Sequence, residues 1–208
     1  MKPLIAALLL ALVAAPAMAS DAVDTTFVKA QGEHAFNVRD LVMMDRVGDP
    51  QLSPDGRYAA FGVRSTDYAA NKGVGAIYVL DLSAAGAQPV KVVDKGGSAR
   101  WSADGRSLYF VAPAKDVAQL WRLDLGGKSG LNPGRHAAPV QVSHGALDLG
   151  GYKLSPDGKQ VLLSYEVFSD CATLTCTQQR VDARDKDKAS GTIYKKLFVR
   201  HWDTWADG

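Results

Sequence analysis

The residues of this sequence that could carry chemistry do not form a catalytic pattern. A serine hydrolase of the α/β type needs Gly-x-Ser-x-Gly followed by an acid and a histidine, and the chain has no such phrase. Phosphate-loop and dinucleotide motifs fail because Arg122 and Tyr78 stand where glycine is required. The histidines lie singly, at His34, His136, His144 and His201. We therefore expect no catalytic residue, no metal site and no cofactor in this chain.

The two cysteines form a candidate disulfide. Cys171 and Cys176 have four residues between them, and a loop can bring their Cα atoms within bridging range. An oxidising compartment would then close the bond. Two free buried thiols are the first alternative. A metal site is the second, but two ligands without a nearby histidine pair fall short of the four that zinc takes.

One turn phrase is repeated three times along the chain. Leu-Ser-Pro-Asp-Gly stands at 52–56 and 154–158, and Trp-Ser-Ala-Asp-Gly stands at 101–105. Aspartate bonds nearby backbone amides and glycine adopts a left-handed conformation, so each phrase predicts a tight turn between strands. We interpret the aspartates as turn residues, because calcium loops gather several acids within a dozen residues. A repeat of about 50 residues is typical of a propeller.

Short strands are expected around each turn. Apolar, partly β-branched runs indicate a first set of strands at 58–63, 108–111 and 161–165, a second at 76–82 and 120–125, and a third at 89–93 and 139–142. The segment that enters each turn supplies a fourth strand, as at 99–102. Four strands per period make one propeller blade. The fold class is therefore all-β, an incomplete β-propeller of about two and a half four-stranded blades.

The start of the chain predicts export. Met1-Lys2 is a positive head, residues 4–13 are apolar, and Ala17-Met18-Ala19 gives a small-residue cleavage pattern, so 1–19 is expected to be a signal peptide. No cysteine lies at the cut to carry a lipid anchor, and no later apolar run reaches the ~20 residues of a membrane span. We expect a periplasmic or secreted protein without a membrane anchor. A net charge of +2 gives no reason to expect nucleic acid as a partner.

The rest of the chain divides into a lead-in and the blades. Residues 20–49 form the lead-in, where Asn37 is expected to cap a short helix that runs through Arg39 to Val47. Residues 50–208 form the blades. Blade three is interrupted by the cysteine loop and by a mixed-charge stretch at 180–188, which we interpret as a solvated insertion. Because closed propellers typically need about four to eight blades, we expect the chain to be the truncated front of a longer protein.

Several phrases together resemble the propeller half of exported serine peptidases of the prolyl oligopeptidase family, in its dipeptidyl-peptidase and acylaminoacyl-peptidase branches. They are Arg-Asp-Leu at 39–41, Asp-Pro-Gln-Leu-Ser-Pro-Asp-Gly at 49–56, the loop from Cys171 to Cys176, and Leu-Phe-Val-Arg-His-Trp-Asp-Thr-Trp at 197–205. The turn phrase alone is less specific, because TolB-like propellers share it.

The resemblance implies a role for this part of the protein. In that family the propeller caps a C-terminal α/β-hydrolase domain in the same chain, restricts access to a Ser-Asp-His triad and helps to hold the amino end of the peptide. The triad would lie beyond Gly208, so this chain alone lacks the hydrolase domain and any catalytic residue. One branch binds the substrate amine with adjacent glutamates. No Glu-Glu pair occurs here, so that pair is either absent or lies further along the protein. Glu166, near a strand end, is the single candidate for substrate binding in this chain, and a plain rim residue is the alternative.

Two other functions are open at the level of the sequence. A TolB-like or WD-type periplasmic propeller that scaffolds other proteins would share the turn phrase and have no hydrolase domain. A propeller enzyme with a metal in its channel would need rings of inward acids or histidines, which the sequence does not suggest.

Overall fold

The computed structural model describes residues 32–127, 130–189, 191, 200–202 and 204–205. The chain divides after Met43 into two compact units, and each is described by itself. In the first unit, helix α1 runs over Val38–Met43. Asn37 caps it, because its Oδ1 accepts from the Arg39 amide and its own amide donates to Asp40, each at 2.8 Å. This reciprocal arrangement is a variant of the capping box.

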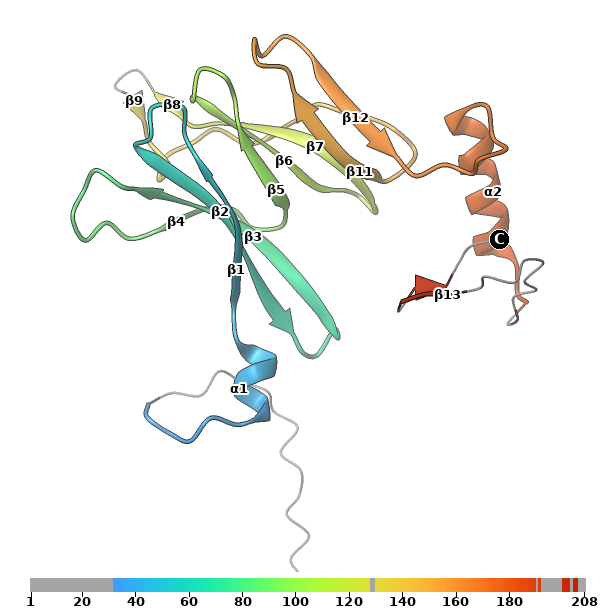
Figure 1. The fold of residues 1–208 in the computed structure, drawn as a ribbon, viewed down its shortest axis with the longest axis horizontal. Helices are drawn as coiled ribbons and strands as arrows, with labels where there is room; N and C mark the ends of the chain where they lie inside the picture. The colour runs from blue at the N-terminus through green and yellow to red at the C-terminus, as the bar shows by residue number, and fades with distance from the viewer. Residues whose placement is uncertain (1–31, 128–129, 190, 192–199, 203, 206–208) are drawn as a thin grey trace, which may run out of the picture. The chain divides into compact units, whose positions relative to one another are not determined.

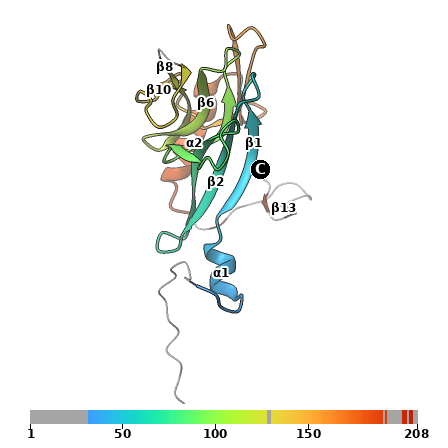
Figure 2. The same cartoon turned by 90° about the vertical axis from the view of Figure 1, so that its left-hand side faces the viewer.

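The second unit begins with a four-stranded antiparallel sheet, blade one (Figure 1). Its strands are β1 (Arg46–Leu52), β2 (Tyr58–Asp67), β3 (Lys72–Asp81) and β4 (Val90–Val93), in that order. In Figure 2, β1 and β2 run side by side, as their pairing requires. The expected helix to Val47 ends early because Arg46 and Val47 already pair with β2. Strand β1 thus starts before residue 50, and a bulge at Asp49 (φ 51°) lets it continue.

Blade two repeats the same pattern about 50 residues later. It contains β5 (Gly97–Trp101), β6 (Ser107–Ala114), β7 (Val117–Asp124) and β10 (Val140–Gln141), in the order β10-β7-β6-β5. The loop between β7 and β10 holds a minor pair that the sequence did not suggest, β8 (Gly126–Gly127) with β9 (Gly130–Leu131). Two successive four-stranded antiparallel sheets confirm the all-β class and the blade repeat.

The third repeat starts as expected and then departs from the prediction. Strands β11 (Leu149–Leu154) and β12 (Val161–Tyr165) pair antiparallel. Helix α2 (Leu174–Lys186) follows, so the charged stretch at 180–188 is mostly helical, and it is exposed, as expected of a solvated insertion. Near the end of the described residues, β13 (Arg200–His201) pairs with β14 (Thr204–Trp205).

The three turn phrases have nearly identical geometry. Gly56, Gly105 and Gly158 adopt φ of 70°, 69° and 68°, the left-handed conformation that glycine takes without penalty. In each turn the aspartate accepts from the serine hydroxyl two residues earlier and from the amide two residues later. The serine hydroxyl bonds hold the pKa of these carboxyls below the ordinary value. The interpretation of these aspartates as turn residues is therefore confirmed.

Blades one and two pack face to face around one apolar core. Ile77 and Val79 from blade one and Leu108 and Phe110 from blade two are almost completely buried in it. Polar contacts join the first strands of successive repeats, β1 to β5 and β5 to β11, at similar places. Trp101 Nε1 donates to the Gln51 carbonyl at 3.1 Å, Arg100 pairs with Asp49 at 2.7 Å, and the Tyr152 hydroxyl donates to the Ser98 carbonyl at 2.7 Å. Each blade is thereby held in register with the next.

Candidate functional site

Glu166, the one substrate-binding candidate from the sequence, follows the last residue of β12 directly and is exposed. It lies on the wall of a cleft of about 500 Å³. The turn between β6 and β7 forms one side of this cleft, the segment that leads into β11 forms another, and α2 closes it. The structure therefore places Glu166 where three segments distant in sequence meet.

The cleft is strongly acidic. Five carboxylates and one guanidinium line it: Asp116, Asp148, Glu166, Asp182, Asp185 and Arg184. Carboxylates are ionised at neutral pH, so the cleft favours a cationic group. Sequence analysis did not find the four aspartates, because they come from separate segments and share no motif.

The uncharged residues of the cleft add a floor and an unsatisfied acceptor. Leu147 and Thr177 are 9% and 2% exposed and lie at its base. Gln178 donates from Nε2 to Asp182 at 2.7 Å, while its buried Oε1 has no hydrogen-bond partner within the described part of the chain. A buried acceptor without a donor is costly. Because this oxygen is buried, it is not open to a ligand in the cleft.

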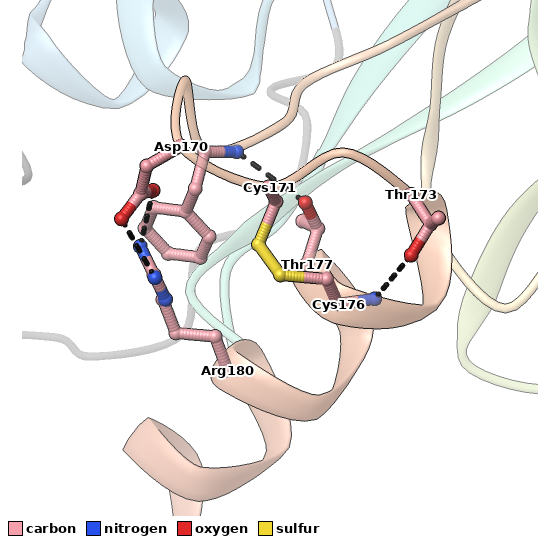
Figure 3. Close-up of a disulfide and its surroundings, with 7 residues drawn as sticks. Asp170, Cys171, Thr173, Cys176, Thr177 and Arg180 are labelled. Atoms are coloured by element: carbon pink, nitrogen blue, oxygen red, sulfur yellow. Dashed lines mark hydrogen bonds and ion pairs between the residues drawn. A yellow bond between two sulfur atoms is a disulfide. The ribbon is translucent and has the colours of Figure 1, made fainter.

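The cysteine pair lies next to this cleft. Cys171 and Cys176 are joined in a disulfide, with their Cα atoms 5.5 Å apart (Figure 3). Thr173 caps α2 by accepting from the Cys176 amide at 3.2 Å. Arg180 donates to both carboxylate oxygens of Asp170 at 2.7 and 2.9 Å, which lowers the pKa of that carboxyl, and its guanidinium lies 4.6 Å from the ring centroid of Phe168.

No group of three or more histidine, cysteine or acidic side chains among the described residues could hold a metal ion. Glu166, the substrate-binding candidate from the sequence, lies in the acidic cleft. No helix in the described part of the chain is long and apolar enough to cross a membrane.

No protein-family model matches this chain. Among solved structures, it is similar to the acylaminoacyl peptidase of Pyrococcus horikoshii, with 16% identity and a TM-score of 0.46, covering 64% of this chain and 20% of that one. It is also similar to TolB from Acinetobacter baumannii, with 25% identity and a TM-score of 0.42, covering 56% of this chain and 26% of TolB.

A curated protein sequence extends the comparison over most of the chain. The chain is 27% identical over 177 residues to dipeptidyl-peptidase 5 of Porphyromonas gingivalis, a match that covers 85% of this chain and 24% of that protein. The chain thus spans about a quarter of the length of this relative. This match confirms the resemblance to peptidases, which the sequence phrases had indicated.

Proposed function

We propose that this chain is the N-terminal propeller part of an exported serine peptidase of the prolyl oligopeptidase family. In this proposal it gates and positions peptide substrates for a C-terminal α/β-hydrolase domain in the longer protein. The match to a dipeptidyl peptidase over 85% of the chain carries the proposal. The blade architecture supports it, because a propeller is a platform whose chemistry comes from its loops, its channel or another domain.

We also propose that the acidic cleft receives the positively charged amino end of a peptide, with Glu166 as the direct contact. An ammonium group forms charge-assisted hydrogen bonds with carboxylates, and the surrounding aspartates raise the local concentration of cations. A single glutamate set among aspartates would thus do the work of the missing Glu-Glu pair.

Export to the periplasm or the medium is part of the proposal. The signal-peptide pattern at residues 1–19 supports it. The Cys171–Cys176 disulfide supports it as well, because disulfides persist mainly in oxidising compartments.

The amine site is tested by Glu166→Gln in the purified chain. We expect the variant to bind a dipeptide amide with a free amino group about threefold to tenfold more weakly, because one charge-assisted contact is lost. Titration followed by NMR measures this, with the N-acetylated dipeptide amide as the uncharged ligand. The wild-type chain should bind the free amine and not the acetylated form.

Glu33→Gln is the matched control, because Glu33 is the other glutamate of the chain and lies outside the cleft. It makes the same change of charge and should leave binding unchanged. Equal binding of the free and acetylated ligands, or equal losses in the two variants, would refute the amine site. A scaffold of the TolB or WD type predicts that outcome, since it has no need of a peptide amine.

A further inference from the structure

We propose that the Cys171–Cys176 disulfide positions the α2 wall of the acidic cleft, so that the oxidised protein holds the cleft in its binding shape. The inference rests on the proposed function only in what the cleft binds. Its structural part stands on the contacts at the start of α2. In this view Cys171 and Cys176 are positioning residues, which act through the side chains that follow them.

Helix α2 has little apolar packing to hold it in place. Among its thirteen residues, from Leu174 to Lys186, only Thr177 is buried. Most helices in proteins gain their stability from burying an apolar face. A helix this polar depends instead on specific polar and covalent contacts with its neighbours.

Those contacts gather at the N-terminal end of α2 (Figure 3). The disulfide ties the first turn of the helix to the loop that follows β12. The Phe168 amide donates to the Thr177 hydroxyl at 3.4 Å, a long bond that cannot hold the helix alone. The ion pair of Arg180 with Asp170 is bidentate but exposed, so solvent and salt weaken it. The disulfide is the covalent restraint among these contacts, and it joins the start of α2 to the loop after β12.

The Cys171–Cys176 disulfide also connects the two sides of the cleft. Glu166 lies on one side of it, two residues before Phe168. Thr177 and Gln178 come directly after Cys176 on the other side, and both line the cleft with Glu166. Asp182 and Asp185 follow on the same helix. Opening the disulfide would release the wall that carries these acids while β11 and β12 stay paired.

Hydrogen exchange of the full chain, read by mass spectrometry, tests the restraint. We compare the oxidised protein with the Cys171→Ser/Cys176→Ser double variant and with wild type reduced by a dithiol. The dithiol gives up two electrons and two protons, leaves as its cyclic disulfide, and converts the S–S bond to two thiols. Amides of α2 should exchange at least about tenfold faster in both open forms. Amides of blades one and two should be unchanged.

The Arg180→Gln variant is the control that keeps the disulfide and removes the exposed ion pair. It should accelerate exchange in α2 much less than opening the disulfide does. The unfolding midpoint of each form, followed by circular dichroism, checks that both sheets persist. Equal exchange of α2 in oxidised and open forms would overturn the proposal.

Binding of the dipeptide amide separates this inference from the proposed function. If the oxidised chain binds the free amine, both open forms should bind it at least about threefold more weakly, although blades one and two remain folded. Unchanged affinity in the open forms would contradict the positioning role. If the oxidised chain binds no amine at all, the proposed amine site fails, while hydrogen exchange still decides whether the disulfide holds α2.

Discussion

Phe110→Ala should lower the free energy of unfolding by about 3–5 kcal/mol, the usual cost of removing a buried aromatic ring. Phe110 lies in β6, is 1% exposed, and stands at the interface where blades one and two share their core. The neighbouring strands are held by their own hydrogen-bond ladders, so the cavity cannot close completely. Urea unfolding followed by circular dichroism measures the loss.

Leu162→Ala is the control for that experiment. Leu162 is 70% exposed on β12, and removal of an exposed side chain should change stability by less than about 0.5 kcal/mol. Equal losses in the two variants would mean that the two sheets do not share a core at Phe110.

Gly75→Ala should destabilise the fold by about 1–3 kcal/mol through overpacking. A Cβ atom at Gly75 would lie 2.8 Å from the Gly96 carbonyl oxygen, which is backbone and cannot turn aside. The Gly96 amide also donates to the Gly75 carbonyl at 2.9 Å, so a shift that makes room would break this bond. These contacts join the connection between the blades to β3. Thermal and urea unfolding of the purified variant measure the effect.

Gly97→Ala provides the matched control one residue beyond this contact. A Cβ atom there meets nothing within 4 Å, and Gly97 is not among the glycines with positive φ. Alanine loses less backbone freedom on folding than glycine, so the variant should be as stable as wild type or slightly more stable. A stable Gly75→Ala protein would show that the two backbones are not held so close.

The strands could be predicted because their signals are local. Each turn is built by a serine, an aspartate and a glycine within four residues, and the apolar run after it needs no distant partner to be seen. Strand β12 has the bounds expected from the sequence. The four strands of blade one and the four strands of blade two were also expected. The start of β1 was missed because pairing of Arg46 with Arg64 overrides the local helix signal.

Helix α2 and the cleft could not be predicted from local sequence signals in the same way. The sequence of α2 is polar and lacks a clear apolar face, so its charges correctly indicate a solvated segment but do not indicate a helix. The one usable signal was Thr173, which caps the helix. Glu166 was found through a family resemblance, whereas Asp116 and Asp148 reach the cleft only through packing of blade two beside blade three. Contacts of that kind have no signature in a single sequence.

Sequencing the reading frame downstream of Gly208 shows whether these blades serve a peptidase. We expect further blade repeats with Asp-Gly turns, then Gly-x-Ser-x-Gly, and after it the aspartate and histidine of a catalytic triad. A frame that ends without a hydrolase segment would contradict the proposed function.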